Sequence, residues 1–305
     1  MTELIYLELQ LFAEGNTNVT TDPGLSVENK TFYDRALIEE ASPNLIHDQF
    51  AQKRPIPKNG GKKIEFRKYA SLPKALTPLT EGVTPDGKKL SVTAIEAEVS
   101  QYGDYVELSD MLDLTAIDNN VLEATKAVGK QAGVTLDTIT RNVMHTGTNV
   151  FYCPKVAEDG TKTEVLSRAN LDKTAKLTVD VIKKVVAFLK KNNAPKIDGN
   201  YVAIIHPYAA YDLMCDPKWE EYHKYTDSTN LFEGEIGKIA GVRFVETSEA
   251  KVYAGEGCPD GLAVFGTIVL GAGAYGTTEI TGGGLETIVK QLGSAGTADP
   301  LKLAA

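Results

Sequence analysis

Six residues near the carboxyl end of the chain have the spacing of a dinucleotide-binding loop. The segment Gly271-Ala-Gly273-Ala-Tyr-Gly276 matches G-x-G-x-x-G and follows a short apolar run typical of a strand. In a dinucleotide site a helix begins at these glycines and binds the pyrophosphate, and an acidic residue about 20 positions later binds the ribose. Residues 277–284, TTEITGGG, do not favour a helix. We therefore interpret the glycines as turn residues and predict no cofactor.

The histidines and cysteines form no metal-binding or catalytic pattern. They are His47, His145, His206, His223, Cys153, Cys215 and Cys258. None has the H-E-x-x-H or C-x-x-C spacing of a zinc site, and three scattered cysteines do not make a disulfide framework. The chain also has no G-x-S-x-G elbow and no Walker loop for nucleophilic or phosphoryl chemistry. The sequence thus predicts no catalytic residue, no metal site and no enzyme.

The densest charge lies between residues 53 and 74, where eight basic residues accompany one acidic residue, Glu65. The whole chain is acidic, with 41 acidic against 32 basic residues and a formal net charge of −9, which argues against tight neutralisation of nucleic-acid phosphates. Three interpretations of the basic run stay open. The first is a solvated face, the second is a nucleic-acid patch, and the third is a surface complementary to acidic neighbouring copies of the same chain.

The basic run lies on an expected hairpin. Ile64 and Phe66 alternate with charged residues, as in a half-buried strand. A second strand is expected near residues 90–99, where the alternation changes phase after Ala94 and predicts a bulge or a twist. Between them, residues 69–89 hold three prolines and two glycines, which suit neither a helix nor a central strand. Because such long connections are uncommon inside compact domains, we expect an arm that lies on another molecule.

The rest of the sequence predicts a mixture of helices and strands. The longest helix is expected at residues 120–145, where Gly129 and Gly133 indicate close packing of another element. Its expected apolar face consists of Leu122, Val128, Ala132, Leu136, Ile139 and Val143. Further expected elements are a short helix from Ser109, a hairpin turn at Asp159-Gly160, a helix capped by Thr178, strands at 201–207, 242–246 and 285–290, and a helix with Pro207 in its first turn.

The amino-terminal residues 1–12 are apolar but do not form a signal peptide. No basic segment precedes the apolar run, and Glu3 and Glu8 interrupt it. Residues 13–30 have the polar composition of a flexible connector, so the two segments together predict an extended arm.

Three segments carry a resemblance to a known family. They are IPKNGGKKIEFRKYASLPKALTPLTEGVTPDGKKLSV, QYGDYVELSDMLDLTA and GEIGKIAGVRFVETSEAKVY, and the opening LQLFAEG is similar to the start of many phage capsid proteins. Together they resemble the N4-like family of tailed-bacteriophage major capsid proteins over roughly residues 30–300. That family is understood to have the Hong Kong 97 capsid fold, an α+β fold.

The resemblance implies a division of the chain into five parts. These are an N-terminal arm at 1–52, an extended β-hairpin called the E-loop at 53–108, a peripheral domain with a long spine helix at 109–175, an α/β axial domain at 176–265, and a return to the peripheral domain with a C-terminal tail at 266–305. The implied E-loop contacts between subunits are Lys58, Lys62, Lys63, Glu65, Arg67, Lys68, Pro78, Glu81, Lys88 and Lys89. The implied N-terminal arm contacts are Leu7, Leu9, Leu11 and Phe12.

The function implied by the resemblance is structural. Copies would assemble into hexamers and pentamers of an icosahedral head that encloses double-stranded DNA without sequence-specific binding, with no cofactor and no membrane. Scaffolding, portal and decoration proteins are the implied partners, and the protein would assemble in the bacterial host cytoplasm and reside in the virion. The alternatives are a soluble α/β enzyme and a nucleic-acid-binding module.

Overall fold

The protein has a mixed fold of helices and strands in two compact units. The structure is a computed structural model, and it describes residues 37, 40, 41, 45–108, 120–224, 238–255 and 257–281. One unit comprises residues 1–42, 104–131 and 285–305, and the other comprises residues 43–103 and 132–284. In the described part of the chain, no helix has both the length and the apolar character needed to cross a bilayer.

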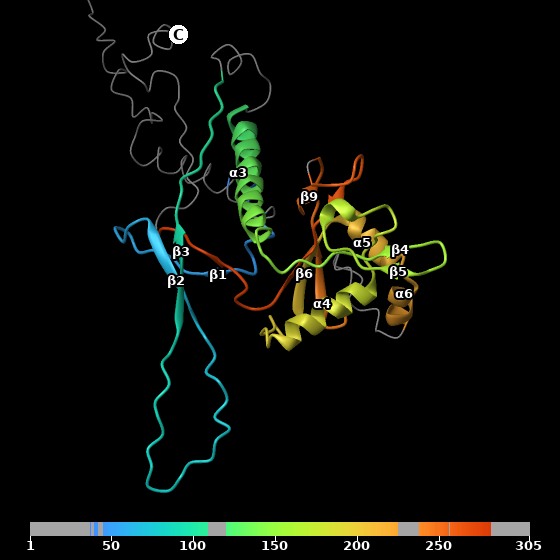
Figure 1. Ribbon diagram of the computed structural model, residues 1–305. Coiled ribbons are helices and arrows are strands. Elements are labelled where there is room, and N and C mark those ends of the chain that lie inside the picture. The colour runs from blue at the N-terminus through green and yellow to red at the C-terminus, as the bar shows by residue number, and fades with distance from the viewer. Residues whose placement is uncertain are drawn as a thin grey trace, which may run out of the picture. The chain divides into compact units, whose positions relative to one another are not determined.

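The larger unit contains a four-stranded sheet with a buried core. The strand order is β11-β6-β8-β7, in which β6 and β8 are parallel and both β11 and β7 are antiparallel to their neighbours. The elements are β6 (Tyr201–Ile205), β7 (Lys238–Ile239), β8 (Val242–Glu246), β11 (Ile268–Leu270), α4 (Val179–Lys191) and α5 (Pro207–Met214). All five residues of β6 are buried, as expected for a strand covered on both faces. The core is formed by side chains from α4, α5, β6, β7 and β8 together with Trp219. Figure 1 labels α4, α5 and β6 among these elements.

Several sequence predictions for this region are confirmed. The strand at Val242–Glu246 has the predicted bounds, and Pro207 occupies the first turn of α5. The predicted cap of α4 is only partly right, because Thr178 takes the cap position without a side-chain hydrogen bond. Instead the Val179 N–H donates to Asp216 Oδ2 at 2.9 Å, and Asp216 Oδ1 accepts the Lys218 N–H at 3.0 Å. One carboxylate therefore caps both α4 and α6 (Pro217–Lys224).

The long helix α3 (Asn120–Met144) confirms the prediction for residues 120–145. The predicted apolar face is only partly right, since five of its six members are partly buried and Val143 is 64% exposed. The buried positions instead recur at every fourth residue and are small or polar: Thr125, Gly129, Gly133 and Asp137. A Cβ at Gly129 would lie 2.8 Å from the carbonyl oxygen of Leu37, so the predicted close packing at this glycine is confirmed.

The remaining strands form two-stranded sheets. They are β1 (Gln52–Lys53) with β12 (Gly276–Thr277), β2 (Lys63–Tyr69) with β3 (Val92–Glu98), β4 (Lys155–Val156) with β5 (Lys162–Thr163), and β9 (Val252–Tyr253) with β10 (Val264–Phe265). A three-residue 3-10 helix, η3 (Arg168–Asn170), lies between β5 and α4. Gly160 has a φ of +82° in the β4–β5 turn, which confirms the Asp159-Gly160 hairpin.

The G-x-G-x-x-G segment is a turn that leads into β12. No helix begins in the described residues 271–281, in agreement with the sequence analysis. Two of its glycines permit close packing: a Cβ at Gly271 would lie 2.6 Å from the Pro195 carbonyl oxygen, and one at Gly276 would lie 2.5 Å from the ring of Phe66. The predictions for residues 1–12, for the helix from Ser109 and for a strand at 285–290 concern residues outside the described part.

Candidate functional site

The hairpin of β2 and β3 is exposed over most of its length. The two strands pair antiparallel over seven positions, from Lys63 opposite Glu98 to Tyr69 opposite Val92. The connecting residues 70–91 contain no strand or helix and are exposed throughout (Figure 1). Every residue of β3 has one partner on β2, so no bulge follows Ala94, and of the two expected alternatives only the twist stays a prediction. A bulge would be needed only if the apolar side chains before and after Ala94 had to lie on the same buried face. Only Ala97 of β3 is partly buried, so β3 has no such face.

All ten hairpin residues named from the sequence are exposed. Lys63 Nζ lies 3.6 Å from Glu96 Oε2, and Arg67 lies 3.3 Å from Glu65. These pairs are open to solvent on both sides and each stabilises the hairpin by less than about 1 kcal/mol. In the described part of the chain, other lysines of this region have no ion pair: Lys58, Lys62, Lys68, Lys74 and Lys89. The hairpin thus carries positive charge that its own fold does not use.

The sequence analysis missed a second property of the hairpin, which is its exposed apolar side chains. Those more than half exposed between residues 69 and 95 are Tyr69, Leu72, Leu76, Leu79, Val83, Leu90 and Ile95. Leu76 is 82% exposed and Leu79 is 75% exposed. Scattered exposed leucines are ordinary, but here they recur along one arm, and the subunit itself does not cover them. The signal in the sequence is the recurrence of leucine within a Pro- and Gly-rich stretch that cannot form its own core.

The base of the hairpin is held by backbone pairing. β1 lies parallel to β12, with Gln52 opposite Gly276 and Lys53 opposite Thr277. The pairing continues at buried Ile56, whose N–H donates to the Glu279 carbonyl at 2.7 Å and whose carbonyl accepts the Thr281 N–H at 2.8 Å. The chain is therefore fixed immediately before the hairpin.

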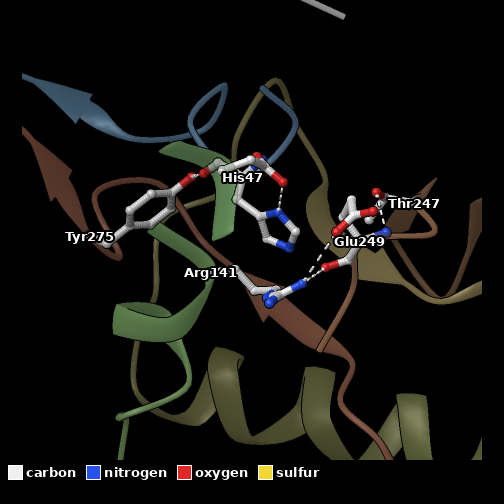
Figure 2. A network of polar contacts seen from close by, with 6 residues as sticks. His47, Arg141, Thr247, Glu249 and Tyr275 are labelled. Carbon is white, nitrogen blue, oxygen red and sulfur yellow. Dashed lines mark hydrogen bonds and ion pairs between the residues drawn. The ribbon is translucent and has the colours of Figure 1, made fainter. Parts of the chain in front are cut away.

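A buried hydrogen-bonded pair fixes the same segment to α3. The backbone N–H of His47 donates to Asp137 Oδ1 at 2.6 Å, and His47 Nδ1 lies 2.7 Å from Asp137 Oδ2. Both side chains are fully buried. The Tyr275 hydroxyl donates to the His47 carbonyl, as Figure 2 shows. Burial, together with nearby Asp48 and Asp137, raises the pKa of the Tyr275 phenol well above its usual range, so the hydroxyl remains a donor.

A further polar contact joins α3 to the loop before β9. Arg141 Nη1 donates to the Glu249 carbonyl and lies 3.8 Å from Glu249 Oε2, and the Glu249 N–H donates to Thr247 Oγ1 at 3.1 Å (Figure 2). Next to it, His145 Nδ1 lies 3.0 Å from the Tyr253 hydroxyl. Burial, reinforced by nearby cationic groups, lowers the pKa of His145 to about 4. The ring is therefore neutral at physiological pH.

Metal-ligating and thiol side chains occur at several places among the described residues. No three His, Cys, Asp or Glu residues among them come together as a metal site. Burial raises the pKa of the Cys153 thiol to about 11, which disfavours a reactive thiolate. A groove of about 1000 Å³ runs beside β8, and its lining includes Asp198, Arg243 and Glu246 but no histidine or cysteine. The polar cluster of Figure 2 instead joins segments that are far apart in the sequence.

Comparison with known proteins points to one class. A family model described as phage capsid protein matches residues 93–277, which is 185 of the 305 residues. The capsid of Ralstonia phage GP4 aligns with a TM-score of 0.52 at 13% identity, covering 73% of this chain and 72% of that chain. The capsid of cyanophage P-SCSP1u aligns with a TM-score of 0.49 at 14% identity, covering 68% and 65%. The cyanophage Pam1 capsid aligns with a TM-score of 0.49 at 11% identity, covering 69% of each chain. No curated protein gives a significant sequence match.

Replacing Asp137 with alanine tests the buried pair. The change leaves the His47 ring and N–H without their partner inside the protein, so we expect the free energy of unfolding to fall by about 3–5 kcal/mol. Urea denaturation of the unassembled protein measures it. Asp104→Ala is the control. Asp104 accepts a hydrogen bond from Gln131 of α3, the helix that also contains Asp137, but Asp104 is exposed, so its loss should change stability little. Equal losses in both variants would contradict the anchoring role.

The low pKa of His145 predicts a pH dependence of stability. Between an ordinary histidine pKa of about 6.5 and the folded value of about 4, the unfolded chain binds a proton that the folded chain does not. This contribution is complete above pH 6.5 and is lost as the pH falls to 4. The slope of unfolding free energy against pH is proportional to the number of protons taken up on unfolding. In His145→Gln this number should be smaller by up to one between pH 4 and 6.5, so the slope should be smaller. Identical slopes, from urea denaturation at several pH values, would refute this assignment.

Proposed function

The chain belongs to the phage capsid protein family, and on that premise we propose that it is the major capsid protein of a tailed bacteriophage. In this proposal its copies form hexamers and pentamers of an icosahedral head around double-stranded DNA. We further propose membership of the N4-like group and the Hong Kong 97 fold. The observation that carries the proposal is an anchored hairpin whose distal residues 70–91 are exposed over their whole length.

The hairpin is suited to bind a second copy of the chain. A two-stranded hairpin alone is only marginally stable in water, and here the exposed apolar side chains add a cost in solvent. Contact with a neighbouring subunit would stabilise the hairpin and would remove its apolar side chains from water. The partner we propose is another copy, because the chain outside the hairpin is acidic and attracts a basic arm.

The main described elements then have a proposed place in the subunit. The hairpin lies within the proposed E-loop at 53–108, α3 is the proposed spine helix of the peripheral domain at 109–175, and the four-stranded sheet lies mainly in the proposed axial domain at 176–265. Residues 266–305 return to the peripheral domain, and the pairing of β12 with β1 supports a return toward the start of the hairpin. Leu7, Leu9, Leu11 and Phe12 are proposed contacts of the N-terminal arm and lie outside the described residues.

The proposed relation to DNA is enclosure without tight binding. With a formal net charge of −9, the protein would repel a polyanion over most of its surface, so the shell contains the genome without neutralising it. Scaffolding, portal and decoration proteins are further proposed partners, and the proposed location is the virion after assembly in the host cytoplasm.

Shortening the hairpin tests the proposal. The Ala70 N–H donates to the Ser91 carbonyl at 2.9 Å, so residues 71–90 can be replaced by Asn-Gly, a turn that closes a two-residue hairpin without changing the register. We expect an unchanged melting temperature for the subunit and no shells, tubes or hexamers by negative-stain microscopy, where the unaltered chain forms them.

A second variant separates the sequence of the arm from its length. Replacing residues 71–90 with a Gly/Ser segment of equal length keeps the reach and removes the leucines and lysines, and it should also fail to assemble. Shells formed by the shortened variant would contradict the role of the arm. A strictly monomeric unaltered chain at high concentration would contradict the capsid proposal itself.

A further inference from the structure

A second basic stretch of sequence lies outside the hairpin. Residues 181–197 contain five lysines and no acidic residue, in a chain whose formal net charge is −9. Residues seven positions apart lie on the same side of a helix, because they are separated by nearly two turns. Four of the five lysines belong to α4 and form two pairs with this spacing, Lys183 with Lys190 and Lys184 with Lys191. The fifth, Lys196, follows in the connection to β6.

Three of these lysines, at and just beyond the carboxyl end of α4, carry charge that the subunit does not neutralise. They are Lys190, Lys191 and Lys196, which are exposed and have no ion pair within the described chain. Lys196 Nζ lies 5.9 Å from the centre of the Tyr201 ring, a contact that leaves its charge in place. Lys184 differs, because it pairs with Glu164.

The end of α4 does not need these lysines as hydrogen-bond donors. The last carbonyls of a helix have no partner inside it, and lysine side chains can satisfy them. Here the backbone N–H groups of residues 192–194 donate to the carbonyls of Phe188, Leu189 and Lys190 at 3.0–3.1 Å. Attraction between a cation and the helix dipole falls off beyond the last turn, so the dipole does not account for Lys196.

The composition of this surface fits a nucleic-acid backbone better than a protein partner. No large apolar side chain of residues 179–200 is exposed, and exposed Asn192 and Asn193 lie between the lysines. The cores of protein interfaces are apolar and depleted in lysine, whereas lysine and asparagine are common donors to phosphate oxygens. The hairpin differs in this respect, because its lysines accompany exposed leucines.

We propose that Lys190, Lys191 and Lys196 form a sequence-independent contact with the phosphates of double-stranded DNA. This inference rests on the proposed function, which supplies the enclosed DNA, and it adds the surface that faces this DNA. The α4 side of the four-stranded sheet is then turned toward the genome. A small basic patch is compatible with a net negative chain, because charges more than about 8 Å away are largely screened at physiological ionic strength.

Removing the three charges tests the contact. The variant combines Lys190→Gln, Lys191→Gln and Lys196→Gln, and fluorescence anisotropy measures binding of the unassembled full chain to a labelled duplex of about 20 base pairs. For the unaltered chain, three phosphate contacts predict an affinity that falls about 40-fold between about 50 and 200 mM NaCl. The variant should bind at least about tenfold more weakly at about 50 mM NaCl, with a smaller dependence on salt.

A matched control removes the same charge from the hairpin region. It combines Lys58→Gln, Lys62→Gln and Lys68→Gln, three exposed lysines that have no ion pair in the part of the chain that the structure describes. The control should bind the duplex as the unaltered chain does, and a duplex of unrelated sequence should bind equally well. Melting temperatures close to that of the unaltered chain establish that both variants are folded.

Three results would overturn the inference. They are no binding by the unaltered chain at about 50 mM NaCl, a control weakened as much as the α4 variant, and an α4 variant that binds normally. Normal DNA binding together with lost assembly in the α4 variant would assign the patch to contact with another protein. Assembly is scored separately by negative-stain microscopy. Shells from the unaltered chain would leave the proposed capsid function standing whatever the DNA result, and their absence would remove that function.

Discussion

A two-stranded hairpin cannot bury enough of its own surface to hold a fixed shape in water, and this constraint governs the described structure. β2 and β3 contribute only Ile64, Phe66 and Ala97 as partly buried side chains. The long connection between them has no core. The subunit can therefore position the arm only from its base, and the shape of the rest of the arm depends on what covers it.

The base is built from contacts between segments far apart in the sequence. β1 pairs with β12, the ring of Phe66 fits against Gly276, and the guanidinium of Arg54 lies 5.3 Å from the centre of that ring. The buried pair of His47 and Asp137 adds a polar contact to α3. Such pairs contribute little net stability compared with apolar packing, but breaking one is costly, so they favour one arrangement over others. The anchor thus specifies where the arm leaves the subunit.

Local patterns predicted local structure well, and long-range contacts were the main source of error. Alternation and proline placement identified β8, α5 and the hairpin. By contrast, the Asp216 cap of α4 comes from 37 positions away and the Asp137 partner of His47 from 90 positions away, so no spacing rule could find them. The buried line of α3 was missed because it consists of small and polar residues, which hydrophobic periodicity does not register. The basic run on the hairpin was visible in the sequence because charge needs no partner to be recognised, and its contact with another copy stays a proposal.

Hydrogen exchange of assembled against unassembled protein tests the central claim most directly, which is that the arm is completed by contact with another copy. Peptides covering residues 63–98 should exchange rapidly in the unassembled chain and become protected on assembly, while peptides covering the buried strand β6 should exchange slowly in both states. An arm that exchanges equally fast in the assembled shell would contradict the account.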